Sequence, residues 1–314
     1  MARYQRYRAL YLNPWSIYVA QNHQKQVDKR PYMSYIPEDV RRYYNEYGDK
    51  EWKRLEGSLH GRVQFETTTS VVAKYLKDGD YVLDAGGGPG RYAIWLARRG
   101  AKVYLGDISE EQLRIARTKI KEADVEASVK MVKRLDICDM EDIPDHTFDM
   151  VLCLGGALSY VRERHVDALA ELIRVAKPGS PIAISAMSLL GTFHLISTLD
   201  AADFLENIED HVEWTRGSAF PDIMYSKPGS PEWHTPMTLY TSTYLRYLLE
   251  EMGCNVVETA ATNTITSGEF KLPRITESPE AVEALIELEK SFCSHPGVTD
   301  MGQHILIVAR TPAR

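Results

Sequence analysis

The sequence predicts an α/β fold in which helices flank a mostly parallel sheet. Short apolar segments alternate with helix-like segments over residues 71–186. Between the first such strand and the first helix, the stretch YVLDAGGGPGR (81–91) places four glycines within five residues. Alternating strands and helices need crossover connections, which make neighbouring strands parallel. With 314 residues, 44% of them hydrophobic, the chain suits one large domain or a domain with an insertion.

The predicted strands are short and apolar. The fourth carries no charge after Asp149, as expected for a strand that is buried on both faces. The third is the weakest, because charged residues interrupt it. The first strand is expected to end at Val82-Leu83. The next four are expected to cover 103–105, 129–132, 148–154 and 182–186.

Helices are predicted between these strands from apolar spacing and capping residues. Ser109 and Gln112 form a capping box that opens the second helix of the alternating region. Gly100 is expected to stop the helix before it, over 91–99. A further helix around 166–173 precedes the turn Lys177-Pro178-Gly179, and another is expected near 280–292.

The glycine-rich loop predicts a ligand site. One glycine is enough for a tight strand-to-helix turn, whereas several allow a ligand to approach the backbone at a helix N-terminus. Asp107 ends the second strand, 21 residues after Gly86, where an acid would meet ribose hydroxyls. The dinucleotide fingerprint G-x-G-x-x-G fails, because its last glycine would fall on Arg91. This argues against a nicotinamide-dependent oxidoreductase.

Several segments together resemble class I S-adenosylmethionine (SAM) dependent methyltransferases. VLDAGGGPGRYAIWLARRGAKVYLGDIS is similar to the first two cofactor motifs of that family, and LDICDM to the third. FDMVLCLGGALSYV resembles the fourth motif, and ELIRVAKPGSPIAIS the helix, turn and fifth strand that follow. The resemblance covers roughly 60–190 and returns near 240–310. It implies a three-layer Rossmann-like sheet of about seven strands, the last antiparallel.

The resemblance implies a role for each matching residue. Asp84, Gly86, Gly88 and Gly90 would form the loop under the methionine part of SAM. Asp107 would accept hydrogen bonds from the ribose, and Asp136 one from the adenine amino group. The remaining positions are Ile108 and Ile137 on the two faces of adenine, Leu154 beside the sulfonium, and Arg62 on the SAM carboxylate. A structural role remains the alternative for Asp136, as a helix cap, and for Arg62, as a solvated side chain.

The residues after the fourth strand predict the type of acceptor. Leu154-Gly155-Gly156-Ala157 lacks the N/D-P-P-Y motif of amino-directed enzymes, the Pro-Cys nucleophile of cytosine enzymes and an acid for magnesium. The resemblance therefore implies metal-free transfer to an O, N or S atom of a small molecule, leaving S-adenosylhomocysteine. His194, His234 and Tyr160 are candidate general bases; a structural role is the alternative for each, and a thiolate or neutral amine would need no strong base.

Regions outside the common fold are expected to recognise the substrate. Residues 1–57 form a predicted helical arm or lid, because nine of the 18 tyrosines lie before residue 48. Residues 58–190 are the expected SAM-binding core, and 191–240 are an aromatic-rich cap insertion. The remainder of the core is expected over 241–314, with an insertion at about 263–303. The arm is alternatively a packing face or a homodimer contact.

Composition limits the other classes. A net charge of −7 argues against nucleic acid as a partner, although the basic arm leaves a nucleic-acid or protein methyltransferase open. An aminopropyltransferase would be expected to have acids at 154–157. A non-catalytic subunit with the same fold is the remaining alternative; its loop would have decayed. The four cysteines show no C-x-x-C pair, and no apolar run would span a membrane, so we expect a cytoplasmic protein.

Overall fold

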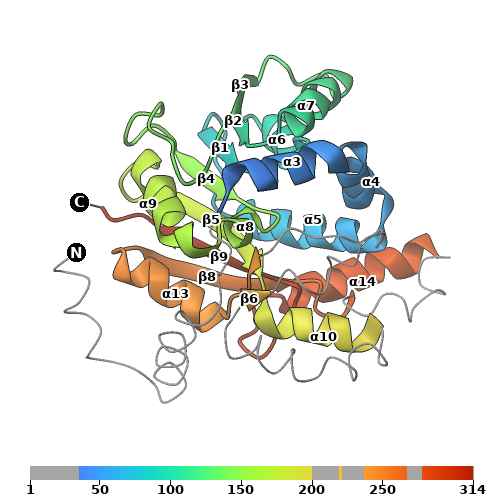
Figure 1. Cartoon of the computed structure of the whole chain (residues 1–314). Helices are drawn as coiled ribbons and strands as arrows, with labels where there is room; N and C mark the ends of the chain where they lie inside the picture. Colours follow the sequence, from blue (N-terminus) through green and yellow to red (C-terminus); the bar gives the residue numbers. More distant parts are fainter. Residues whose placement is uncertain (1–34, 200–218, 221–236, 267–277, 314) are drawn as a thin grey trace.

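A computed structural model describes residues 35–199, 219–220, 237–266 and 278–313 of the chain (Figure 1). Its main sheet has seven strands in the order β3-β2-β1-β4-β5-β9-β8. The first five are parallel, and β9 runs antiparallel to both of its neighbours. The predicted α/β class, the Rossmann-like sheet of about seven strands and the antiparallel last strand are therefore confirmed.

Burial of the strands follows their place in the sheet. The central strands β4 and β5 are buried along nearly their whole length, as their unbroken apolar sequences predict. The edge strand β3 exposes Lys130, Met131 and Lys133, and lysine on an edge discourages pairing with another chain. The bounds are β1 Tyr81–Ala85, β2 Lys102–Asp107, β3 Val129–Arg134, β4 Met150–Cys153, β5 Pro181–Met187, β8 Asn255–Thr262 and β9 His304–Arg310.

Two helical layers cover the sheet. On one face, residues of α5 (Leu59–Val72), α6 (Arg91–Ala97) and α7 (Glu110–Glu122) pack in one core with Val82, Val103 and Leu306. On the other face, residues of α8 (Ala157–Tyr160), α9 (His165–Val175) and α13 (Ser242–Glu251) pack with Leu83, Val151 and Ile182. Side chains alternate along each strand, so neighbouring residues supply the two cores.

Helices α3 (Pro37–Tyr47) and α4 (Asp49–Gly57) lie outside these layers. Helix α3 contacts α7, and α4 contacts α5 (Figure 1). Helix α3 buries Val40 and Tyr43, whereas α4 buries no residue completely. The predicted arm over 1–57 therefore includes two real helices that pack on the core, and its first 34 residues lie outside the described part.

The predicted helices match the observed ones closely. Ser109 Oγ accepts from the amide of Gln112 at 3.1 Å and begins α7 as expected. Ser278 caps α14 (Pro279–Phe292) through the amide of Ala281 at 3.2 Å, where a helix over 280–292 was expected. Helix α6 ends at Ala97, before Gly100, whose φ of +84° suits the turn that follows.

The predicted cap and insertion are only partly described. Within 191–240 the structure describes the end of α10 (Leu189–Leu199) and the short strands β6 (Ala219–Phe220) and β7 (Met237–Thr238). The rest of that segment, and 267–277 in the predicted insertion, lie outside the described residues. The division into four regions stays a prediction.

A buried carboxylate fixes the loop that follows β8. Glu289 on α14 is 0% exposed and accepts five hydrogen bonds, from the amides of Thr264, Ile265 and Thr266 and from both threonine hydroxyls. A buried charge needs such partners, and these donors in turn need the carboxylate.

We predict that Glu289→Gln lowers the free energy of unfolding by about 2–4 kcal/mol, because an amide group cannot accept all five bonds. Glu287→Gln on the same helix is the control, since Glu287 is exposed and pairs only with Lys290 among the described residues. Urea unfolding followed by circular dichroism measures both variants. Equal stability of the two variants would contradict this account of the loop.

Candidate active site

A cavity lies at the carboxyl ends of β1, β2 and β4, beneath α3 and α4. The glycine loop forms its floor, through Gly86, Gly87 and Gly88. Residues that follow β2 and β4 form its sides, and Tyr35, Val40 and Tyr44 cover it from the N-terminal part of the chain. Ligands of open α/β sheets bind at this edge, where the strand order reverses. Here β1 is that point, with β2 on one side and β4 on the other.

Each glycine of the loop has its own physical reason. Gly86, Gly88 and Gly90 have φ of +71°, +53° and +85°, a region that favours glycine. A Cβ on Gly86 would lie 2.6 Å from the Cβ of Ala157, and one on Gly87 would lie 2.5 Å from Oδ2 of Asp84. A Cβ on Gly88 would meet no atom within 4 Å, so this glycine borders open space on the cavity side.

Asp107 joins this loop to the next helix. Its Oδ2 accepts from the amide of Gly88 at 2.8 Å, and its Oδ1 accepts from the amide of Ser109 at 2.9 Å. The side chain lines the cavity, and burial raises its pKa to about 6 despite these two bonds. A buried carboxylate with lone pairs left towards a cavity suits a ligand with neighbouring hydroxyl groups.

Asp136 lies on the same wall and is held by the covering segment. Its Oδ1 accepts from the hydroxyl of Tyr35 at 3.1 Å and from the amide of Cys138 at 2.9 Å. Ile108 and Ile137 line the cavity beside it. The structure thus brings one carboxylate and two aliphatic side chains together, as binding of a flat heterocycle with an amino group requires.

Asp84 supports the loop from below. Its side chain is 0% exposed and lies under Gly87, outside the cavity lining. Burial, and then the charge of Asp107, raise the pKa of Asp84 to about 7, and the amide of Ala93 opposes the rise. Two buried carboxyl groups, those of Asp84 and Asp107, therefore lie close enough to interact beside the glycine loop.

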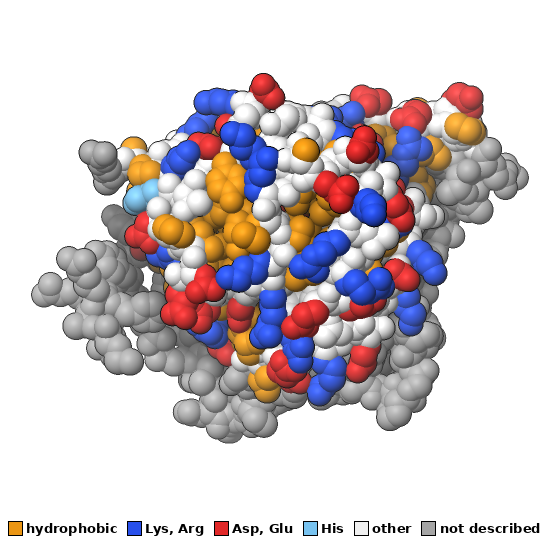
Figure 2. Space-filling view, turned by 90° about the horizontal axis from the view of Figure 1, so that it is seen from above, with side chains coloured by type: hydrophobic (Ala, Val, Ile, Leu, Met, Phe, Trp, Pro, Cys, Tyr) orange, Lys and Arg blue, Asp and Glu red, His pale blue; other side chains and the backbone are white. Residues whose placement is uncertain are grey.

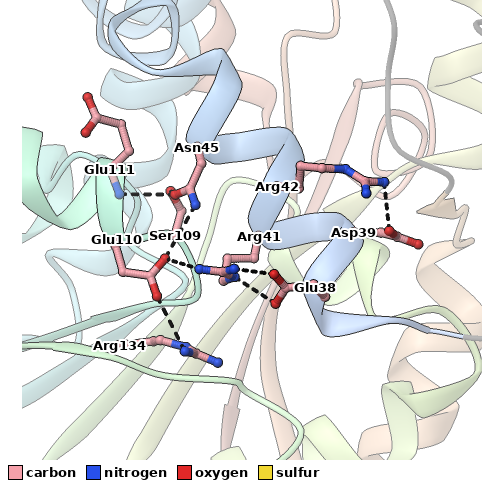
Figure 3. Close-up of polar contacts among 9 residues, drawn as sticks. All are labelled: Glu38, Asp39, Arg41, Arg42, Asn45, Ser109, Glu110, Glu111 and Arg134. Atoms are coloured by element: carbon pink, nitrogen blue, oxygen red, sulfur yellow. Dashed lines mark hydrogen bonds and ion pairs between the residues drawn. The ribbon is translucent and has the colours of Figure 1, made fainter.

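A polar clamp fastens α3 across the start of α7 (Figure 3). Asn45 Oδ1 accepts from the hydroxyl of Ser109 at 2.7 Å and from the amide of Glu111 at 3.1 Å. Arg41 pairs with Glu110 at 2.9 Å, and Gln112 Nε2 donates to the carbonyl of Tyr44 at 3.1 Å. Because Ser109 is also bonded through its amide to Asp107, this clamp ties the covering helix to the cavity wall.

Inside the cover, aromatic and paired charged groups face the cavity. Tyr44 and Tyr160 share a hydrogen bond, and their rings meet edge to face with centroids 5.7 Å apart. Arg54 makes two bonds to Glu51, at 2.7 and 3.0 Å. Arg91 donates to the carbonyl of Gly61 at 2.9 Å. These contacts enclose the space under α3 and α4.

The predicted cofactor residues, Arg62 apart, gather at one place. Gly86, Gly88, Asp107, Ile108, Asp136, Ile137 and Leu154 line the cavity, and Asp84 and Gly90 support its floor. Arg62 does not reach it, because its half-exposed side chain pairs with Glu283 on α14. Arg54 and Arg91 line the cavity in its place. The binding roles of all these residues remain predictions.

The three candidate bases lie apart from one another. Tyr160 is buried in the cavity wall, and burial raises its pKa, which disfavours proton removal by this hydroxyl at neutral pH. His194 is exposed on α10 and does not line the cavity. His234 lies outside the described residues.

Other cavity residues carried no sequence motif. Tyr35, Glu51, Gln64 and Tyr92 line the space, and only the tyrosine-rich composition before residue 48 pointed to one of them. Among the described residues, no three His, Cys, Asp or Glu side chains gather as a metal-binding group. Within the same part of the chain, no helix is both long and apolar enough to cross a membrane.

Comparisons with known proteins find methyltransferases. Residues 82–179 match the family model described as a methyltransferase domain. The chain is 31% identical over 151 residues to magnesium-protoporphyrin O-methyltransferase from Synechocystis. This match covers 44% of this chain and 63% of that protein. It is 31% identical to methyltransferase GfsG from Streptomyces halstedii over 42% of this chain and 50% of that protein. The chain thus spans half to under two thirds of these relatives.

Two relatives match over more of their length. The tRNA 5-carboxymethoxyuridine methyltransferase of Escherichia coli is 23% identical over 86% of this chain and 97% of its own. The crystal structure of magnesium protoporphyrin IX methyltransferase from Synechocystis, with S-adenosylhomocysteine bound, matches with a TM-score of 0.54 and 20% identity. That match covers 87% of this chain and 98% of the other, and it supports the fold.

We predict that Asn45→Ala loosens the clamp and speeds amide hydrogen exchange in α3 by about thirtyfold, because two hydrogen bonds of about 1 kcal/mol each are lost. Arg42→Ala is the matched control, since the Arg42 bond that the structure shows stays within the helix, to Asp39 at 2.9 Å. Mass-spectrometric exchange of the ligand-free protein gives both rates. Unchanged protection of α3 in Asn45→Ala would show that the clamp does not hold the cover.

Proposed function

Because this chain belongs to the class I SAM-dependent methyltransferases, we propose that it moves a methyl group from SAM to an O, N or S atom of a small molecule. The contact that carries the proposal is the pairing of Asp107 with the amide of Gly88, at the edge of a partly open cavity. It holds a buried carboxylate beside an open glycine loop. The carboxylate would bind a ribose, and the loop would leave room for the amino-acid part of the same ligand.

The cavity residues suit SAM part by part. The loop at Gly86 and Gly88 gives backbone room for the methionine part, and Asp107 has lone pairs for the ribose hydroxyls. Asp136 accepts from Tyr35 and Cys138 through Oδ1, which leaves Oδ2 for the adenine amino group. Arg54 or Arg91 replaces Arg62 as the proposed partner of the carboxylate, because both line the cavity.

The remaining residues shape the space around the reacting atoms. When bound, SAM supplies a methyl group that its sulfonium charge already activates. Leu154, Gly155 and Ala157 then border the acceptor side, and none carries a charge or a metal ligand. We therefore propose transfer without a metal, in which the chain holds the acceptor in line and keeps water out.

The helical arm and the cap are proposed to close this site. Tyr35, Val40 and Tyr44 already cover the cavity, and the clamp at Asn45 fixes them. The segment 191–240 begins just beyond β5, at the same edge of the sheet. A cytoplasmic enzyme that acts on a small molecule fits this arrangement, and a homodimer contact remains an alternative role for the arm over 1–57.

A nucleic-acid acceptor is the second candidate, and the long match to the tRNA methyltransferase favours it. On the face seen in Figure 2, basic and acidic side chains are interspersed and hydrophobic ones lie between them. Such a surface lacks the continuous positive charge that phosphate binding favours. Labelled SAM offered to total tRNA and, separately, to a low-molecular-weight extract distinguishes the two. A protein acceptor remains a further alternative.

We predict micromolar-scale binding of SAM by calorimetry and a loss of at least about tenfold in Asp107→Ala. The variant lacks an acceptor of charge-assisted hydrogen bonds worth about 1.5–3 kcal/mol each before compensation. Asp142→Ala is the control, because Asp142 is exposed on the surface and pairs with Lys133. If the wild-type protein failed to bind SAM, the proposed function would be lost.

The same carboxyl predicts a pH dependence. Since the pKa of Asp107 is raised to about 6 in the ligand-free protein, the carboxylate form is complete only above that pH. We expect SAM affinity to fall as pH drops through about 6, by up to about tenfold per pH unit. Asp107→Asn should remove this part of the dependence between pH 5 and 7. Persistence of the full dependence in that variant would assign it to another group.

A further inference from the structure

Four buried polar side chains near the ends of β8 and β9 each have an atom with no hydrogen-bond partner among the described residues. The atoms are Gln64 Oε1, Thr262 Oγ1, Asn263 Oδ1 and His304 Nδ1. The four residues are 0–6% exposed, and we call them the polar seam. Nearly all buried polar atoms in proteins have a partner, and each one without costs about 1–3 kcal/mol. Four together therefore indicate a partner that the described part of the chain does not supply.

Strand register and helix spacing bring the seam together. Thr262 on β8 pairs with His304 on β9, and cross-strand partners point to the same face of a sheet. Asn263 Nδ2 donates to the carbonyl of His60 at 3.0 Å, which places the start of α5 over these strand ends. Gln64 lies one helical turn beyond His60.

The seam borders the proposed SAM cavity. Gln64 itself lines that cavity. A Cβ on Gly156 would lie 3.5 Å from Cε1 of His304, so the imidazole packs against the glycine pair that ends β4. Gly155 and Ala157, on either side of Gly156, line the cavity. Since neither Gly155 nor Gly156 has a side chain, no side chain of this pair lies between His304 and the place proposed for the acceptor.

We propose that the polar seam binds the reacting hydroxyl group of an uncharged small acceptor, and that Nδ1 of His304 accepts its hydrogen bond. This rests on the proposed function and names the acceptor chemistry of the same site. None of the four side chains is an acid or a permanent cation, so a charged acceptor group would lack compensation. Two of the free atoms are amide oxygens, which only accept, so the ligand must donate.

The surroundings of His304 keep its ring uncharged. Burial, and then the nearby His60 and Arg54, lower the pKa of His304 to about 3. A neutral imidazole can accept at Nδ1 when its proton is on Nε2. Such a weak base does not ionise a hydroxyl beforehand. It can take the proton as the oxygen gains its new carbon, because the oxygen is then strongly acidic.

The seam is held in place by contacts outside it. Asn263 Nδ2 also donates to Thr266 Oγ1 at 3.0 Å, and Glu289 fixes Thr266 through its amide and its hydroxyl. This buried network holds the loop after β8 in one conformation, and it therefore fixes the direction in which Oδ1 of Asn263 points. A site formed in advance in this way favours a specific acceptor.

Histidine NMR tests this proposal without knowledge of the natural acceptor. Protein labelled with ¹⁵N-histidine is saturated with S-adenosylhomocysteine and titrated with phenol, with anisole and benzoate as matched probes. We expect phenol to move the Nδ1 resonance of His304, assigned with His304→Asn, and to leave exposed His295 unchanged. Anisole cannot donate and benzoate is charged, so neither should reproduce the shift.

Thr262→Val supplies a second reading, because it removes one hydroxyl and keeps the side-chain shape. We expect it to weaken phenol binding about fivefold, which corresponds to about 1 kcal/mol for one neutral hydrogen bond. An unmoved His304 resonance, or equal shifts with phenol and anisole, would overturn the proposal. Failure to bind S-adenosylhomocysteine would instead count against the proposed function, so the two failures are distinguishable.

Discussion

The carboxylate of Asp107 is the contact on which the rest of the site depends. One oxygen holds the amide of Gly88 in the glycine loop, and the other holds the amide of Ser109 at the start of α7. Ser109 in turn caps α7 and donates to Asn45 on the covering helix. A single side chain thus connects the floor, the wall and the cover of the cavity, and the end of β2 sets the position of all three.

This arrangement carries an electrostatic cost in the ligand-free protein. Burial raises the pKa of Asp107 to about 6 and that of Asp84 to about 7, from an ordinary value of 3.8. The protonated form of each carboxyl favours folding, and this contribution is complete below about pH 4. It is lost as pH rises through about 6 for Asp107 and through about 7 for Asp84. At neutral pH both carboxyls therefore oppose folding, and hydrogen-bond donors of a ligand at Asp107 would offset part of that cost.

The sequence predicted the parts of the site that local chain geometry determines. The glycines, Asp84 and Asp107 lie in one strand-turn-helix-strand unit, so their spacing alone places them around one turn. Arg62 shows where this reasoning ends: its partner Glu283 is 221 residues away, and only the packing of α14 on α5 decides which way Arg62 points. Tyr35 reaches Asp136 across 101 residues, and no local pattern encodes that contact.

His304 lay beyond sequence reasoning for the same physical reason. It begins a strand that returns antiparallel between β5 and β8, and the register of those two pairings places it beside Gly156. Every residue of the polar seam lies outside residues 82–179, which match the methyltransferase domain. The part of the chain shared with the family therefore supplies the groups around the proposed cofactor. The groups proposed for the acceptor come from α5, from β8 and the residue that follows it, and from β9, all outside that matched part.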